Sequence, residues 1–167
     1  MIYSIILTTY KTTKKNKTKW KIKIKKMNRE KLLDLYNKYE LTKDDVYKHQ
    51  HYVIITRMGI EKIQAKEKIN ISYEVIKCET NFAVFKAIAF LNSKPSVLIE
   101  TFGSALKGGS FKDGNCNTWY VAEMAEKRAL SRAVLKLTGF YELGVFGEDE
   151  SEDFKKVNKD KLINLNK

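Results

Sequence analysis

The residues best suited to binding chemistry lie in the stretch TWYVAEMAEKRALSRAVLKLTG, which runs from Thr118 to Gly139. Its spacing predicts one long helix, with Gly139 where a left-handed cap would end it. Arg128, Arg132 and Lys136 are four residues apart and therefore stack on one helical face. Alanines at positions 122, 125, 129 and 133 allow the helix to lie close against another surface. The pattern predicts a basic helix that holds an anionic polymer, and the alternative is an ordinary solvated basic face.

The groups around this helix supply further candidates. Glu123 stands four residues before Lys127, in the order that favours a surface ion pair. The three cations named above have no acid four residues before them, so we expect them to be the freer charges. Three aromatic residues next to the predicted helix start would stack on the bases of a single strand, although core packing is the favoured interpretation for the tryptophan. They are Phe111, Trp119 and Tyr120.

Other motifs have the residue types of catalytic or metal sites without the spacing. GSALKGGS, over 103–110, has the glycines of a phosphate loop, but position 109 is Gly where that motif needs Lys. His49 and His51 lack further ligands at suitable spacing, so a structural role is favoured. Glu100 lies inside an apolar strand, and we expect it on the open face or paired with a base. A run of acids in the last part of the chain is of a kind that is usually solvated: Glu148, Asp149, Glu150, Glu152 and Asp153. We therefore predict a protein that is not an enzyme and uses no cofactor or metal.

The charge of the chain is unevenly distributed. The 167 residues carry a formal net charge of +12, but residues 1–26 hold nine lysines and no acid, which leaves +3 for the remainder. We interpret residues 1–26 as a basic tail, as an edge strand, or as sequence upstream of a natural start at Met27. Cys78 and Cys116 are far apart and form no metal motif, which favours a reducing compartment. No apolar run approaches the roughly 20 residues of a membrane helix. We expect a cytoplasmic protein, associated with the nucleoid or made in a phage-infected cell, with no membrane partner.

Periodicity along the rest of the chain predicts an α+β fold. Helical spacing covers Asn28–Tyr39, the segment 41–45 and Gly59–Ile69, and a short β-branched run predicts a strand over Tyr52–Thr56. Strands are predicted over 71–78, 82–91 and 97–105, with links short enough to require antiparallel pairing. The expected architecture is an antiparallel meander of three to four strands with the long helix packed on one face and short N-terminal helices. We divide the chain into the tail 1–26, a domain over 27–147 and a flexible tail over 148–167, and expect FYELGVFG (140–147) to pack weakly.

The helix and the elements before it resemble the single-strand annealing proteins, which are the Rad fifty-two recombination mediators of eukaryotes and their phage counterparts. HYVIITRMGIEKI (51–63) and ETFGSA (100–105) are similar to the segments that precede that family's helix, and the resemblance spans about residues 45–147. Counted from the terminal glycine, the family's paired Lys-Arg falls at Ser131 and Arg132, so only the arginine is kept in that register. The family's acidic start, Lys/Arg-Arg-Ala-Leu core and terminal glycine are represented here by Glu123, Glu126, Lys127, Arg128, Ala129, Arg132, Ala133 and Gly139.

The resemblance implies a protein that binds single-stranded DNA, assembles into a homo-oligomeric ring and anneals complementary strands in recombination and repair, without nucleotide hydrolysis and with other recombination proteins as further partners. Three alternatives stay open: a double-stranded RNA-binding module, whose last helix would need a lysine cluster that is missing here, a metal-dependent nuclease using Glu100 and the acids after 147, and a module that binds only protein. The predicted DNA-binding residues are Lys127, Arg128, Arg132, Lys136, Arg57, Lys62 and Lys107.

Overall fold

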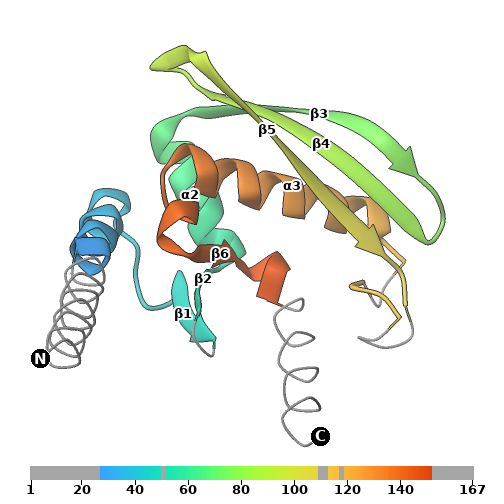
Figure 1. Ribbon diagram of the computed structural model, residues 1–167, viewed down its shortest axis with the longest axis horizontal. Coiled ribbons are helices and arrows are strands. Elements are labelled where there is room, and N and C mark those ends of the chain that lie inside the picture. Colours follow the sequence, from blue (N-terminus) through green and yellow to red (C-terminus); the bar gives the residue numbers. More distant parts are fainter. Residues whose placement is uncertain (1–26, 50–51, 109–112, 117–118, 152–167) are drawn as a thin grey trace, which may run out of the picture. The chain divides into compact units, whose positions relative to one another are not determined.

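The computed structural model describes residues 27–49, 52–108, 113–116 and 119–151 (Figure 1). The chain divides into two compact units, residues 1–38 and residues 39–167. The predicted basic tail over 1–26 and the part of the predicted C-terminal tail over 152–167 lie outside the described residues. The fold class is α+β, as predicted, with an antiparallel meander, a long helix on one of its faces and a short N-terminal helix.

The described part of the first unit is helical. Residues 27–39 form one helix, which confirms the prediction for Asn28–Tyr39. Leu32, Leu35 and Tyr36 are half-buried, while the charged residues Arg29, Glu30, Lys31 and Asp34 are exposed, so the helix is amphipathic as its spacing indicates. Burial raises the pKa of the Tyr36 hydroxyl to about 12.

The meander lies in the second unit and consists of β3 (Ile69–Cys78), β4 (Phe82–Leu91) and β5 (Lys94–Leu106), in that spatial order. Both neighbouring pairs are antiparallel, as their short links require. The pairing of β3 with β4 shifts between Val75 and Lys77, which marks a bulge near the end of β3. Because β4 is central, β3 and β5 are the two edges of this sheet.

Helix α3 (Val121–Leu137) lies along one face of the meander (Figure 1). A Cβ added to Gly103 of β5 would collide with the carbonyl oxygen of Ala125 and the amide nitrogen of Ala129, so the helix backbone contacts the strand directly. The Thr101 hydroxyl also donates a hydrogen bond of 2.8 Å to the carbonyl oxygen of Ala129. The predicted close approach of the alanine side is thus confirmed. It depends on Gly103, which lies in β5, within the strand predicted over 97–105.

A second sheet, which the sequence did not predict, lies on the other side of α3 (Figure 1). It contains β1 (Val46–His49), β2 (Tyr52–Ile55) and β6 (Val145–Gly147) in the order β1-β2-β6, and β6 runs parallel to β2. The expectation that residues 140–147 pack weakly is wrong, because Phe140 and Val145 are fully buried. β2 confirms the strand predicted over Tyr52–Thr56 from its β-branched run. β1 and β6 were not predicted, because strands of three or four residues are too short for alternation of polar and apolar residues to identify them.

Helix α2 (Arg57–Glu67) confirms the predicted helix with shifted ends. It begins earlier than predicted because the Thr56 hydroxyl caps it, accepting a hydrogen bond of 3.3 Å from the amide of Gly59. It ends at Glu67 because Lys68 takes a left-handed conformation, with φ of 51°. β3 then starts at once.

The segment 41–45 is not a helix, contrary to the prediction. It forms a turn in which the Asp45 carboxylate accepts hydrogen bonds from the Thr42 amide at 2.8 Å and the Thr42 hydroxyl at 2.9 Å. The side chains of the sequence TKDD therefore satisfy the backbone locally, as Thr and Asp commonly do in turns.

Candidate nucleic-acid interface

Two of the predicted DNA-binding residues on α3 turn inward. Arg128 is only 2% exposed, and its Cβ lies against Gly103 of β5. The Arg132 side chain is 28% exposed, and its Nε donates to Glu150 Oε1 at 2.5 Å while its Nη1 donates to the Phe102 carbonyl oxygen at 2.7 Å. The expectation that these arginines are the freer cations of the helix is wrong, since the fold itself engages both. Whether they touch DNA stays a prediction.

The two lysines of α3 each lie beside an aromatic ring. The Lys127 Nζ is 5.8 Å from the centre of the Tyr120 ring, and the Lys136 Nζ is 5.5 Å from that of Tyr141. These distances permit cation–π attraction. The predicted pairing of Glu123 with Lys127 does not form, and within the described segments Lys127 makes no ion pair. The lysines are about 13 Å apart along the helix axis, so α3 does not present one continuous basic ladder.

The start of α3 carries an exposed aromatic group. Trp119 is 78% exposed, more than any other large hydrophobic side chain in the described residues, so the expectation that it packs in the core is wrong. Its ring meets that of Tyr120 edge to face, with centroids 5.7 Å apart and an interplanar angle of 83°. We call Trp119, Tyr120 and Lys127 the Trp119 cluster. It combines an open aromatic surface with a cation that forms no ion pair with any carboxylate in the described segments.

Lys107 lies near the same end of the sheet. It is exposed, directly after β5, and its amide donates to the Asn81 carbonyl oxygen at 2.7 Å. It also pairs with Cys116 through an isolated bridge, and Cys116 is buried in one cluster with Val121 at the start of α3. Lys107 is therefore a predicted DNA-binding residue that lies toward the start of α3, where the Trp119 cluster is. Phe111, the third stacking candidate, lies outside the described residues.

The predicted cations of α2 are engaged in ion pairs. Arg57 pairs with Glu61 one turn later at 2.7 Å, and the Lys62 Nζ lies 2.5 Å from Oδ2 of Asp45, whose side chain is 4% exposed. Burial alone would raise the pKa of Asp45, but hydrogen bonds from Lys62 and Thr42 outweigh it and hold the pKa below its ordinary value. Lys62 therefore has a structural partner that holds the turn 41–45 to α2.

The acids after β6 are not a solvated run where the structure describes them. Glu148–Glu150 form a short 3₁₀ turn, η2, whose three carboxylates each contact a different group. Glu148 Oε2 accepts from the Arg57 amide at 3.2 Å, Asp149 Oδ2 from the Ser131 hydroxyl at 2.8 Å, and Glu150 Oε1 from Arg132. Sequence reasoning missed these contacts because they join residues 18 and 91 positions apart. Glu152 and Asp153 lie outside the described residues.

The catalytic and metal candidates do not assemble around a common point. Glu100 lies on the face of the meander opposite α3. There the Lys86 Nζ is 2.9 Å from a carboxylate oxygen of Glu100 and 3.3 Å from one of Glu74. Glu100 is therefore both on the open face and paired with a base, as expected. Hydrogen bonds to Glu100 and Glu74 raise the pKa of Lys86. His49 ends β1, and His51 lies outside the described residues. In the segments that the structure describes, no three His, Cys, Asp or Glu residues are grouped as metal ligands would be.

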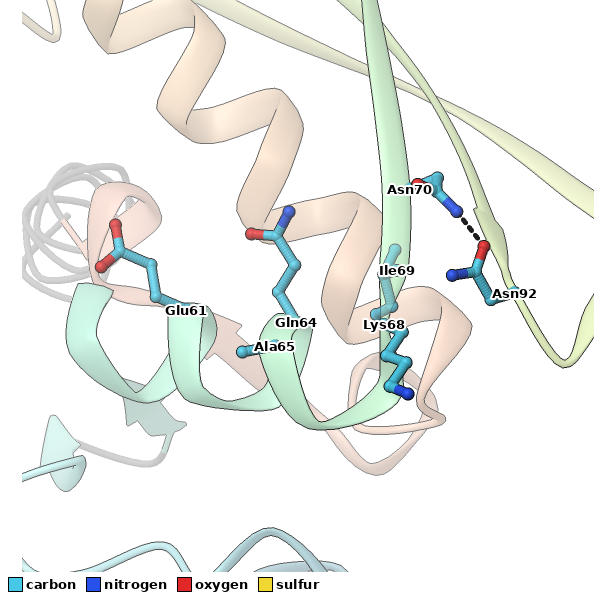
Figure 2. A pocket seen from close by; sticks show the side chains of 7 residues that line it. All are labelled: Glu61, Gln64, Ala65, Lys68, Ile69, Asn70 and Asn92. Atoms are coloured by element: carbon cyan, nitrogen blue, oxygen red, sulfur yellow. Dashed lines mark hydrogen bonds between the residues drawn. The ribbon is translucent and has the colours of Figure 1, made fainter.

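A shallow pocket of about 340 Å³ lies where α2 passes into β3 (Figure 2). Asn70 and Asn92 are joined by a hydrogen bond at its rim, and Lys68 and Glu61 are its charged lining residues. None of the predicted DNA-binding residues lines it. The pocket therefore adds no group to the candidate interface.

Five of the seven predicted residues thus lie in three places: the Trp119 cluster with Lys107, the contacts between η2 and the residues Arg57 and Arg132, and the far end of α3 at Lys136. Of the other two, Arg128 is buried and Lys62 pairs with Asp45. Cys78 is an exposed free thiol, and Cys116 is buried. None of the helices in the described residues is long and apolar enough to cross a membrane. Comparison with known proteins finds no matching family model, no matching curated protein and no matching solved structure.

Proposed function

We propose that this protein binds single-stranded DNA through the Trp119 cluster and Lys107. The observation that carries the proposal is the exposure of Trp119, at 78%, beside a lysine that has no carboxylate partner in the described residues. An indole in water is costly to leave uncovered, and every nucleic-acid base offers a flat surface that covers it. The lysine supplies the charge that a phosphate needs. Single strands suit this arrangement better than duplexes because only unpaired bases are free to stack on a side chain.

Annealing of complementary strands is the finer part of the proposal and rests on the resemblance of the α3 sequence to annealing proteins. In this activity the protein holds each strand by its backbone, bases pair between strands, and no bond is made or broken. Assembly into a homo-oligomer belongs to the same proposal. The outer edge of β3 supports it, since this ten-residue edge strand exposes Tyr73, Val75 and Ile76, and such edges pair readily with another chain. Light scattering coupled to size-exclusion chromatography measures that assembly directly.

The decisive experiment is fluorescence anisotropy of labelled oligothymidylate and of a matched duplex, titrated with the full chain at two salt concentrations. Trp119→Ala should weaken single-strand binding by about 5- to 150-fold, the loss expected for removing one stacked base at about 1–3 kcal/mol. Thermal unfolding should be unchanged, because the side chain is already in solvent. Met58→Ala is the matched control, since Met58 is another large side chain that is 72% exposed, on α2. Equal binding by the wild type, Trp119→Ala and Met58→Ala would contradict the proposed site.

A further inference from the structure

The turn η2 covers the middle of α3 with negative charge. Its three carboxylates contact an amide at the start of α2, a hydroxyl on α3 and a guanidinium on α3, namely Arg57, Ser131 and Arg132. These three groups come from two helices, and all of them are donors. A helix N-terminus, a hydroxyl and an arginine are the groups that proteins use to hold phosphate oxygens. The carboxylates therefore lie on a surface whose chemistry also suits phosphate.

The hold of η2 on this surface is incomplete. The Glu150 side chain is only 6% exposed, yet its Oε2 has no hydrogen-bond partner in the described part of the chain. A buried carboxylate oxygen without a donor has lost its hydration and gained nothing in return, which weakens the contact. The hydrogen bond from the Arg57 amide to the Glu148 carboxylate is also exposed to solvent, so water and salt screen the attraction. Releasing the turn thus costs less than the number of its contacts indicates.

Packing fixes the donors while leaving the acids as the movable part. Ser131 is fully buried on α3, and Gly147 just before η2 approaches it so closely that a Cβ there would lie 2.8 Å from the Cβ of Ser131. Arg132 is also held by the Phe102 carbonyl oxygen of β5, a contact that does not involve η2. The guanidinium therefore keeps its place when Glu150 leaves. The three donors persist as a preformed strip.

We propose that η2 is an autoinhibitory contact, in which Glu148, Asp149 and Glu150 occupy a strip that binds backbone phosphates of a single strand and are displaced by them. The proposal rests on the proposed function and adds a second contact region, with its regulation, to the Trp119 cluster. A strand held at the cluster by stacking has a raised local concentration at the strip, so its phosphates compete with the carboxylates intramolecularly. The affinity for a single strand therefore depends on competition between the carboxylates of η2 and the phosphates of the strand for the same three donors.

The test is single-strand affinity of charge-matched variants of the full chain, measured with labelled oligothymidylate at fixed salt. Glu150→Gln should tighten binding at least about three-fold more than Glu142→Gln, which removes the same charge from an exposed residue of η1 (Tyr141–Leu143) outside the turn. The gain should vanish in Arg132→Gln/Glu150→Gln, since the released arginine is its source. Equal affinities for Glu150→Gln and Glu142→Gln overturn the inference while leaving the proposed function intact. If those two affinities are equal, weaker binding by Trp119→Ala still supports the proposed function. Absence of binding by the wild type and every variant overturns both the proposed function and the autoinhibitory role of η2.

Hydrogen exchange gives a second readout that survives any loss of stability in the variants. In the wild type, oligothymidylate should speed exchange of the amides of 148–151 and slow that of Arg57, because the turn leaves as phosphate arrives. Slower exchange in both segments, or no change at 148–151 while DNA is bound, overturns displacement of η2.

Discussion

The outer side of α3 and the side that packs on the meander both carry positive charge and use it differently. On the outer side, Lys127 lies over the Tyr120 ring, next to the exposed Trp119. On the packed side, Arg128 is buried against β5 and Arg132 joins the helix to Glu150 and to the Phe102 carbonyl. A basic residue on a helix is therefore available to a ligand only where the surrounding elements leave it uncovered.

The helical wheel explains the difference. Successive residues turn by about 100°, so Lys127 points about 200° away from Ala125, nearly opposite the buried alanine side. Arg128 and Arg132 lie within about 60° of Ala125, next to the surface that packs on the sheet. The spacing in the sequence thus indicates that Arg128 and Arg132 flank the alanines closely. It does not by itself decide burial, because Lys136 lies about 20° from Ala125 on the same wheel and is exposed.

The largest effect should come from breaking the contact that sets this geometry. Gly103→Ala introduces a Cβ into the backbone of α3 at Ala125 and Ala129. We expect a loss of about 3 kcal/mol or more in the free energy of unfolding, because backbone on both sides leaves no flexible group to yield. Ser104→Ala is the control, since the next strand residue faces the opposite side of the sheet. Denaturant unfolding with similar midpoints for the two variants would contradict the described packing of α3 on β5.

A smaller effect should separate the two adjacent cations Lys127 and Arg128. Arg128→Ala removes a side chain that is 2% exposed and should lower the free energy of unfolding by about 2–3 kcal/mol. Lys127→Ala should change it by less than about 0.5 kcal/mol but weaken single-strand binding. Urea unfolding and DNA anisotropy on the same preparations measure both. If Lys127→Ala destabilised the protein as much as Arg128→Ala, the contrast between the two sides of α3 would disappear.

The smallest effect concerns Lys62, a predicted DNA-binding residue that a carboxylate engages. The pKa of Asp45 in the folded protein is below its ordinary value, so the stability that this ion pair contributes is present above about pH 4. It is lost as pH falls through the lowered pKa, because protonation of the folded carboxyl breaks the contact. Asp45→Asn should therefore melt at a lower temperature than the wild type at pH 6, and the gap should narrow below pH 4. A gap that is constant from pH 6 to pH 3 would show that the charge of Asp45 is immaterial.

Much of the fold could be predicted because its larger elements have regular patterns. The strands Phe82–Leu91 and Ile69–Cys78, helix α3 and the left-handed Gly139, with φ of 80°, follow from periodicity and turn chemistry over ten or more residues. The second sheet could not be predicted in the same way. Its strands have three or four residues. β6 pairs in parallel with β2 although most of the unit's sequence separates the two strands, and no local pattern encodes such an association.

The sequence by itself determined the meander, the long helix on it and the alanine side by which that helix packs, because each is written in side-chain spacing along a continuous segment. Only the tertiary structure decided which cations face solvent. Arg132 meets Glu150, and Asp45 holds Lys62, through contacts between segments that are distant in the chain. Trp119 is exposed although Val121, two residues later at the start of α3, is buried. Whether a basic side chain is available to a ligand depends on the segments that pack against it, and the residue pattern of a helix does not specify those segments.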